Sequence, residues 1–286
     1  MSAQEPLGGR IAALAETRVL PGGRELRVLP FFAALDLARS LPRTAGRRSL
    51  ALVEREALAQ GVCPERFVRN LETYSLEEQL RLAGAGAGLV GLGGLGGHVL
   101  ELLARAGVGH IRAADGDEFE PSNLNRQLYA TRRSLLGYKA AAAAARMRVV
   151  NPGALFEPIA AQLDEAGMGR LLEGLGLCVD ALGGLEGRAA LARRAAAAGV
   201  PLVTGAVAGQ TGLVATVLPG GTCPAELFGQ GGGAEDRLGT PAPAVAAAAA
   251  IMAGEAVNIL CGRAPALAGK MLAFDLARMS FETLTL

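Results

Sequence analysis

The sequence lacks a surplus of charge of either sign. Its 286 residues carry 28 Lys and Arg against 27 Asp and Glu, which leaves a formal net charge of +1. Nucleic acids and anionic membranes attract proteins through a strong basic field, so neither partner has electrostatic support here. Any recognition of an anion must therefore be local.

Long hydrophobic runs are also missing. Although 51% of the residues are hydrophobic, that share is raised by short alanine runs at residues 140–145 and 246–250. A membrane span needs roughly 20 consecutive apolar residues, and neither run approaches that length. The N-terminal stretch MSAQEPLGGR has no basic start followed by an apolar run, as a secretory signal would have. We therefore expect a cytoplasmic protein without a membrane partner.

Cysteines are few and scattered. Cys63, Cys178, Cys223 and Cys261 form no C-x-x-C pair, which argues against a disulfide framework and against a zinc knuckle. We expect most of them to be small core residues. A chain of 286 residues is long enough to bury a sizeable core without such staples.

Residues 1–64 differ in pattern from the remainder of the chain. Arginines alternate there with short apolar stretches, and Pro21-Gly22-Gly23 interrupts the segment. Residues 49–60 have the spacing of an amphipathic helix, which Gly61 and Pro64 end. The sequence thus predicts a partly helical N-terminal extension at 1–64, followed by one domain at 65–286.

From Gly84 onward the pattern predicts alternating strands and helices. Strands are expected at 87–90, 110–114, 177–182, 201–206, 212–218 and 270–275, and helices at 98–106, 135–150, 187–198 and 244–260. The strand at 212–218 is expected at an edge or in an antiparallel pair, and the glycine-rich residues 229–236 as a mobile loop. This alternation favours an α/β fold, a Rossmann-like doubly wound and mostly parallel sheet with helices on both faces.

A glycine loop gives the first indication of a ligand. Gly91, Gly93 and Gly96 form G-x-G-x-x-G directly after an expected strand and at the head of a helix. Such glycines allow a tight turn and let backbone N–H groups approach a pyrophosphate at the helix N-terminus. In a chain with 40 glycines the motif alone is weak. Asp115 ends the next strand, where a carboxylate can accept ribose hydroxyls, and these features suit NAD and ATP equally.

Two cations further on favour ATP. Arg126 ends the stretch Ser122-Asn123-Leu124-Asn125-Arg126, and Lys139 stands at the head of the next helix. A nicotinamide ring needs an apolar slot, whereas fixed cations stabilise the charge that develops on a triphosphate during attack at its α-phosphorus. Either cation alone would be read as a surface residue.

These motifs resemble, in order, those of the molybdopterin-synthase and thiamine-pathway adenylyltransferases (ThiF/MoeB/HesA), relatives of ubiquitin-activating enzymes. The matching segments are GLGGLGG, Asp115-Gly116-Asp117 before SNLNRQ, Lys139, PLVTGAVAGQTGLVATVLPG and AGKMLAFD. The resemblance covers about residues 65–286. It implies an enzyme that uses ATP and Mg²⁺ to adenylate the C-terminal carboxylate of a small ubiquitin-like sulfur-carrier protein ending in Gly-Gly.

The resemblance also implies roles for individual residues. Gly94 matches the loop glycine that touches phosphate, Asp115 the ribose ligand and Lys139 the triphosphate lysine. Arg69 matches an arginine that such dimers supply to the neighbouring active site, so a homodimer is expected. Nucleotide contacts are assigned to the turn of Asp117, Ser122, Asn123, Asn125 and Arg126.

Two departures from the family pattern stand out. The strand-end motif D-x-x-D-N has Asp180 in its first position but Gly183 in place of the aspartate linked to magnesium. Asp180 and Asp117 are then the nearest carboxylates in the sequence, and of the two we expect Asp180 to hold the metal. The second departure concerns zinc, because Cys223 lacks its C-x-x-C partner, Glu226 stands in that place, and Cys261 is alone. Zinc is not expected.

Two other functions compete with adenylation. A nucleotide-binding scaffold of the same fold, lacking efficient turnover, would explain Gly183. A dehydrogenase would leave Arg126 and Lys139 without a role, and its proton transfer would fall to His98 or His110, which the pattern places as structural or surface residues.

Overall fold

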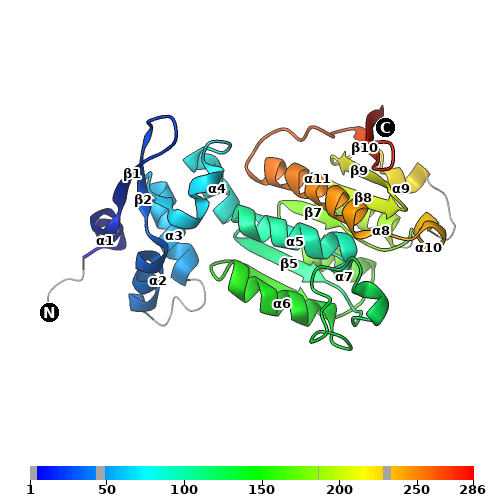
Figure 1. The fold of residues 1–286 in the computed structure, drawn as a ribbon, viewed down its shortest axis with the longest axis horizontal. Coiled ribbons are helices and arrows are strands. Elements are labelled where there is room, and N and C mark those ends of the chain that lie inside the picture. Colours follow the sequence, from blue (N-terminus) through cyan, green and yellow to red (C-terminus); the bar gives the residue numbers. More distant parts are fainter. Residues whose placement is uncertain (1–4, 43–48, 186, 228–232) are drawn as a thin grey trace.

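The computed structural model describes residues 5–42, 49–185, 187–227 and 233–286. A small N-terminal unit lies beside a larger α/β domain (Figure 1). In chain order the unit contains α1 (Leu7–Leu14), β1 (Glu16–Val19), β2 (Glu25–Leu29), α2 (Phe31–Ser40), α3 (Ser49–Ala59), β3 (Cys63–Pro64) and the 3₁₀ helix η2 (Glu65–Asn70). The helix expected at 49–60 is confirmed, while the three-stranded sheet β1-β2-β3 was not predicted.

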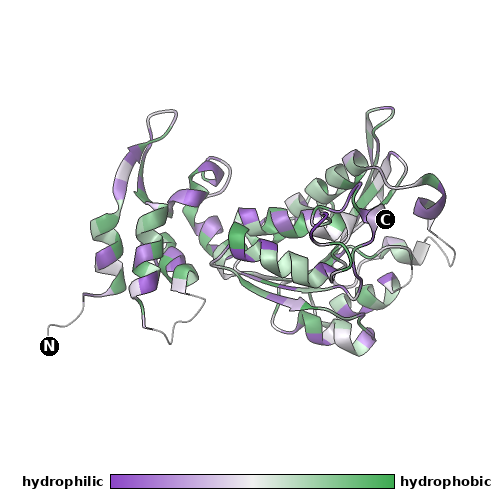
Figure 2. Cartoon of the chain, turned by 60° about the horizontal axis from the view of Figure 1, so that its bottom comes forward, coloured by the Kyte–Doolittle hydropathy of each residue, from purple (hydrophilic) through white to green (hydrophobic). Residues whose placement is uncertain are grey.

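The N-terminal helices bury one face each. Figure 2 shows both hydrophilic and hydrophobic residues in these helices, and their buried residues, among them Ile11, Ala34 and Val53, form one apolar cluster. A second cluster in the unit joins β2 to the following segment, since Val28 and Cys63 pack with Phe67 and Leu71. Arg66 then bridges to the domain, donating to Glu54 Oε1 at 2.6 Å and to Asn151 Oδ1 at 2.9 Å.

The larger domain is built on an eight-stranded sheet within the described chain, in the order β11-β10-β9-β8-β7-β4-β5-β6. Its strands are β4 (Gly86–Val90), β5 (His110–Ala114), β6 (Leu155–Ile159), β7 (Leu177–Asp180), β8 (Leu202–Ala208), β9 (Thr211–Val217), β10 (Lys270–Asp275) and β11 (Ser280–Thr285). Five neighbouring strands run parallel, in the order β8-β7-β4-β5-β6. Strands β9, β10 and β11 extend the sheet beyond β8 in antiparallel pairs.

Helices cover both faces of the sheet, which confirms the predicted fold class. The helices of the domain are α4 (Leu76–Gly84), α5 (Gly94–Ala106), η3 (Pro121–Asn123), α6 (Lys139–Val150), α7 (Glu165–Leu172), α8 (Arg188–Ala197), α9 (Pro224–Leu227), α10 (Ala234–Leu238) and α11 (Ala242–Leu260). Figure 1 shows α5, α6 and α11 on one side. Side chains of β7 alternate between the layers, Leu177 and Val179 packing with α5 and α11, and Cys178 with α7 and α8.

Helix α11 passes through the main core. It is long and apolar enough to cross a membrane by length and composition, with a mean hydropathy of 1.6, a property that the short alanine run within it does not reveal. Four of its alanines, Ala244, Ala248, Ala249 and Ala256, are fully buried, and the helix packs against α5, β8 and β9. Small side chains let the helix approach the sheet closely, so α11 is a core helix.

Several boundaries differ from those expected. The helix predicted at 135–150 begins only at Lys139, because Leu136 adopts a positive φ of 64° and Tyr138 forms an antiparallel bridge with Glu118. Strand β9 is antiparallel, as one alternative held, but it lies inside the sheet. The predicted loop at 229–236 falls partly outside the described residues, and its last three positions belong to α10. A strand, β11, follows the expected last one.

Candidate functional site

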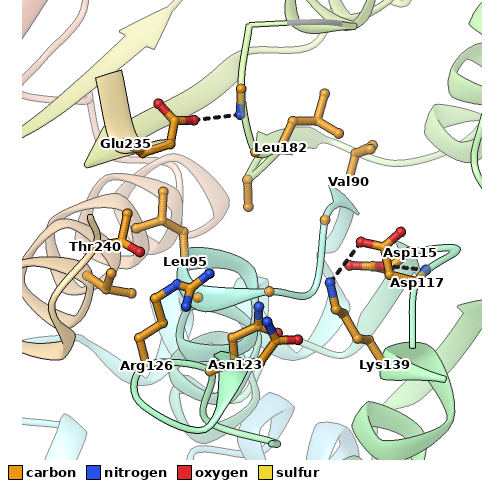
Figure 3. Close-up of a pocket in the computed structure, with 18 of the residues that line it drawn as sticks. Val90, Leu95, Asp115, Asp117, Asn123, Arg126, Lys139, Leu182, Glu235 and Thr240 are labelled. Atoms are coloured by element: carbon orange, nitrogen blue, oxygen red, sulfur yellow. Dashed lines mark hydrogen bonds and ion pairs between the residues drawn. The ribbon is translucent and has the colours of Figure 1, made fainter. Parts of the chain in front are cut away.

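A cavity of about 850 Å³ opens where the carboxyl ends of β4, β5 and β7 meet (Figure 3). Ligands of open α/β sheets bind at this edge. Of the predicted site residues it is lined by Gly91, Gly93, Gly94, Asp115, Asp117, Asn123, Arg126 and Lys139. The fold therefore brings together side chains from segments that span about fifty residues of sequence.

The glycine loop has the geometry that its sequence predicts. Gly91 has φ +94°, and a Cβ on Gly96 would lie 1.9 Å from the carbonyl oxygen of Gly91. No side chain caps the N-terminus of α5, which begins at Gly94 in this described part of the chain. Its first backbone N–H groups thus remain available to an anion, and Gly96 lies behind the cavity as a packing residue.

Asp115 ties the glycine loop to the end of β5. Its Oδ2 accepts the N–H of Leu92 at 2.7 Å, and its Oδ1 accepts the N–H of Asp117 at 2.8 Å. The residue is 9% exposed and borders the cavity. A carboxylate has about four lone-pair sites, so both oxygens keep capacity for ribose hydroxyls.

Lys139 forms a salt bridge with Asp117. Its ammonium donates to Asp117 Oδ2 at 2.8 Å, and Gln162 Nε2 donates to Asp117 Oδ1 at 2.8 Å. The backbone repeats the link, because the N–H of Lys139 donates to the carbonyl of Asp117 at 3.0 Å. The lysine charge is thereby held at the cavity wall at the first position of α6.

Arg126 and Asn123 belong to one turn. Asn123 Oδ1 accepts the N–H of Glu120 at 3.1 Å, which shapes η3. Arg126 Nη1 donates to the carbonyl of Ser122 at 3.0 Å and to Asn125 Oδ1 at 2.8 Å. Both Ser122 and Asn125 are exposed and lie off the cavity, so within the described site they act on Arg126 rather than facing the ligand space.

Asp180 is occupied by protein partners. It is 1% exposed, and its Oδ2 accepts from Arg188 Nη1 and from Thr204 Oγ1, each at 2.7 Å. Arg188 also donates through Nε to the carbonyl of Gly184 at 2.6 Å and through Nη2 to that of Leu182. The pair therefore anchors the loop after β7. Asp180 does not itself line the cavity, whereas Arg188 does.

Glu235 of α10 reaches the same loop. Its Oε1 accepts the backbone N–H of Gly184 at 2.7 Å, and Figure 3 shows it pointing toward the segment that carries Leu182. Sequence reasoning missed both Arg188 and Glu235. Arg188 heads a predicted helix and gave no other signal, while Glu235 was assigned to a loop because of its glycine-rich surroundings.

The remaining candidates lie elsewhere. Arg69 is exposed on η2, away from the cavity. His98 Nδ1 is 2.7 Å from the carbonyl oxygen of Gly94 within its own helix, and His110 pairs with Glu157. Neither histidine borders the cavity in the described chain, so neither is placed to transfer a proton to a ligand bound there.

All four cysteines are buried, as expected for core residues. Burial raises the pKa of the Cys63 thiol to about 12 and that of Cys178 well above its ordinary value. A thiol with a raised pKa carries little thiolate near neutral pH and is a poor nucleophile. These two cysteines are therefore structural.

The chain is similar in sequence to a known protein family over most of its length. The family model described as "ThiF family" matches residues 67–286. A SAMP-activating enzyme E1 from Haloferax volcanii is 34% identical over 226 residues, which are 77% of this chain and 84% of that protein. A sulfur carrier protein adenylyltransferase from Thermus thermophilus is 34% identical over 222 residues, 73% of this chain and 81% of its own.

A solved structure extends the likeness to the N-terminal unit. The crystal structure of PaaA has a TM-score of 0.65 and 18% identity, and the match covers 96% of this chain and 98% of PaaA. At that identity the likeness concerns the fold alone. The small N-terminal unit and the α/β domain therefore recur together in another protein.

Proposed function

This chain belongs to the ThiF family, and we propose that it uses ATP to adenylate the C-terminal carboxylate of a small ubiquitin-like sulfur-carrier protein ending in Gly-Gly. In this reaction a carboxylate oxygen attacks the α-phosphorus of ATP, an acyl-adenylate forms, and pyrophosphate leaves. Relatives named as adenylyltransferases support the reaction type. The carrier protein is our inference from the names of those relatives.

The observation that carries the proposal is the placement of two cations around an uncapped helix N-terminus. Lys139 and Arg126 line the same cavity as the glycine loop at the start of α5. Fixed cations and backbone N–H groups stabilise charge on phosphate oxygens as it develops. A site for NAD would need only the glycine loop and Asp115.

Other residues of the cavity also suit a bound nucleotide. Asp115 is placed to accept ribose hydroxyls while it braces Leu92 of the glycine loop. Gln127 lines the cavity with a buried Oε1 that has no partner among the described residues, an acceptor that fits a donor of the nucleotide. Lys139 would exchange part of its contact with Asp117 for a phosphate oxygen.

The cavity fits Mg²⁺ bound together with ATP. No group of three or more His, Cys, Asp or Glu in the described chain forms a metal cluster, but Mg²⁺ is usually held by one or two carboxylates and the phosphates of the substrate. Asp117 and Glu235 offer carboxylates to the cavity. Bound there, the ion would neutralise phosphate charge. The assignment of the metal to Asp180 stays a prediction, and its three protein hydrogen bonds argue against it.

Three further features belong to the same proposal. The working unit is a homodimer in which Arg69, exposed on η2, serves the neighbouring site. The protein acts in the cytoplasm without nucleic acid or membrane partners. It holds no structural zinc, so elemental analysis should find far less than one zinc per chain, and a stoichiometric content would contradict the ligand analysis.

Pyrophosphate exchange into ATP tests the reaction directly. With a carrier protein ending in Gly-Gly, the wild type should exchange, and Lys139→Ala and Arg126→Ala should each lose about a hundredfold, as loss of a charge-stabilising donor often does. Lys270→Ala removes an exposed lysine on β10 and serves as the control. If the protein binds ATP but shows no exchange with any such carrier protein, the nucleotide-binding scaffold is favoured. If it shows neither exchange nor ATP binding, both the adenylyltransferase and the scaffold are rejected.

A further inference from the structure

The position that lacks the family aspartate has room for one. Gly183 borders the cavity, has no positive φ, and a Cβ built on it would meet no atom within 4 Å. Neither close packing nor an unusual backbone therefore requires glycine here. Among residues 181–185, the described part of the loop after β7, no side chain is a carboxylate.

Asp180 does not compensate for that loss. Its carboxylate faces the Arg188 guanidinium at 2.7 Å, and both side chains are less than a tenth exposed. A buried carboxylate paired with an arginine has its charge balanced already, and drawing it to a metal would leave the arginine without its partner. Asp180 therefore positions Arg188 and the loop rather than a cation.

Glu235 brings a carboxylate to this place from elsewhere in the chain. The hydrogen bond from Gly184 fixes its head group beside Gly183, although the two segments are about fifty residues apart. Glu235 is half-buried, lines the cavity, and has no salt bridge with a cation in the described structure. One backbone donor uses a small part of the acceptor capacity of a carboxylate.

We propose that Glu235 supplies the metal-binding carboxylate that position 183 lacks, so that α10 completes the ATP·Mg²⁺ site. The inference rests on the proposed use of ATP. Hard cations prefer carboxylate oxygens, and one such ligand beside the phosphates meets the usual needs of Mg²⁺. In this chain the metal-binding carboxylate thus comes from α10, which precedes α11, and not from the loop after β7.

Isothermal titration of ATP, with Mg²⁺ or with EDTA, tests the inference without relying on turnover. In Glu235→Gln the amide oxygen can still accept the Gly184 N–H, so the loop keeps its anchor while the charge is lost. Magnesium should tighten ATP binding by the wild type, and this gain should fall about tenfold or more in the variant. Binding in EDTA should stay unchanged. Manganese EPR in the presence of ATP should show more free Mn²⁺ for the variant.

Two further variants sharpen the test. Glu282→Gln removes an exposed carboxylate on β11 and should behave as wild type. Adding Gly183→Asp to Glu235→Gln should restore the magnesium dependence, because the open space at 183 accepts the side chain. Restoration would show that the two positions serve one function, which a merely structural Glu235 would not allow.

The contrary outcomes are distinct. If the wild type does not bind ATP at all, the proposed function fails and the inference falls with it. If ATP binds and Glu235→Gln keeps its full magnesium dependence, the inference alone is overturned. Equal weakening with Mg²⁺ and with EDTA would also overturn it, since this result marks a structural role. If Asp236→Asn loses the magnesium dependence of ATP binding and Glu235→Gln does not, the metal is bound by Asp236 instead.

Discussion

Lys139 and Asp117 form a salt bridge between a buried and an exposed partner. The lysine side chain is 9% exposed and the aspartate side chain 54%, and their charged atoms are 2.8 Å apart. The buried ammonium has given up most of its water and depends on Asp117 for compensation. The exposed carboxylate depends far less on the lysine. A phosphate entering the cavity can therefore take over the lysine at small cost.

Substitution of Asp117 by Asn should destabilise the protein mainly when no nucleotide is bound. The loss of charge beside a buried ammonium should cost roughly 1 to 3 kcal/mol, and bound ATP should restore much of it by supplying the anion. Thermal unfolding with and without ATP measures both effects. The control is Asp36→Asn, which breaks an exposed pair with Arg39. Equal destabilisation in both conditions would contradict the exchange of partners.

Gly96→Ala and Gly254→Ala form a matched pair of helical substitutions. A Cβ at Gly96 would lie 1.9 Å from the Gly91 carbonyl oxygen, so the glycine loop must shift and ATP binding should be lost. A Cβ at Gly254 meets nothing within 4 Å, and alanine there should stabilise α11 by about 0.5 to 1 kcal/mol. Chemical denaturation and ATP titration test the two. Normal ATP binding by Gly96→Ala would be contrary to the geometry.

Mixing of inactive subunits tests the role assigned to Arg69. Arg69→Ala and Lys139→Ala should each inactivate the homodimer, and the mixture should regain partial activity because mixed dimers hold one site with both residues intact. The pair Arg126→Ala and Lys139→Ala is the control, since both changes fall in the same cavity and mixing leaves every site damaged. A monomer at working concentration, or equal recovery in the control, would refute the assignment.

The environment of Glu101 should make the stability of the protein depend on pH. It is 7% exposed and accepts hydrogen bonds from Arg105 on its own helix and from Arg146, and the bond from Arg146 joins α5 to α6. Burial raises its pKa, but the two arginines outweigh that effect and leave the pKa below the ordinary 4.5. Its contribution is therefore complete above pH 4.5 and is lost as the pH falls through the lower folded-state pKa.

Urea unfolding of Glu101→Gln should show this loss. At pH 7 the variant should be less stable than the wild type by roughly 1 to 3 kcal/mol, because the hydrogen bonds from the two arginines lose their buried, charged acceptor. The difference should narrow in acid. Glu173→Gln, at an exposed position, should show little difference at any pH. A gap that widens as the pH falls would be inconsistent with a lowered pKa.

Local signals were enough to predict the central part of the fold. The tight turn at Gly91 and the uncapped start of α5 depend on glycine spacing, which is visible in the sequence, and α11 follows from an apolar run with good helix formers. The sequence predicted that Lys139 and Arg126 lie at one site. Lys139 begins a helix and Arg126 belongs to a turn, and both features depend on nearby residues.

Features that depend on contacts between distant segments were not predictable in this way. Glu235 matters because its helix folds back onto Gly184, and nothing in the glycine-rich sequence around it indicates that contact. The strands β1 and β2 lie outside the main sheet and are partly exposed, so their apolar pattern is weak. The place of β9 inside the sheet depends on β10, which follows it by about fifty residues.

The order of α5 and α11 along the chain bears on how the protein folds during synthesis. Helix α11 begins at residue 242, yet it packs against β8, β9 and α5, and α5 already ends at residue 106. During translation the side of α5 that α11 covers stays open until residues 242–260 have been made. Docking of α11 is thus a late folding step, in which an alanine-rich helix must find a waiting apolar surface. Until α11 docks, that apolar surface is of the kind that makes a partly folded chain prone to aggregate.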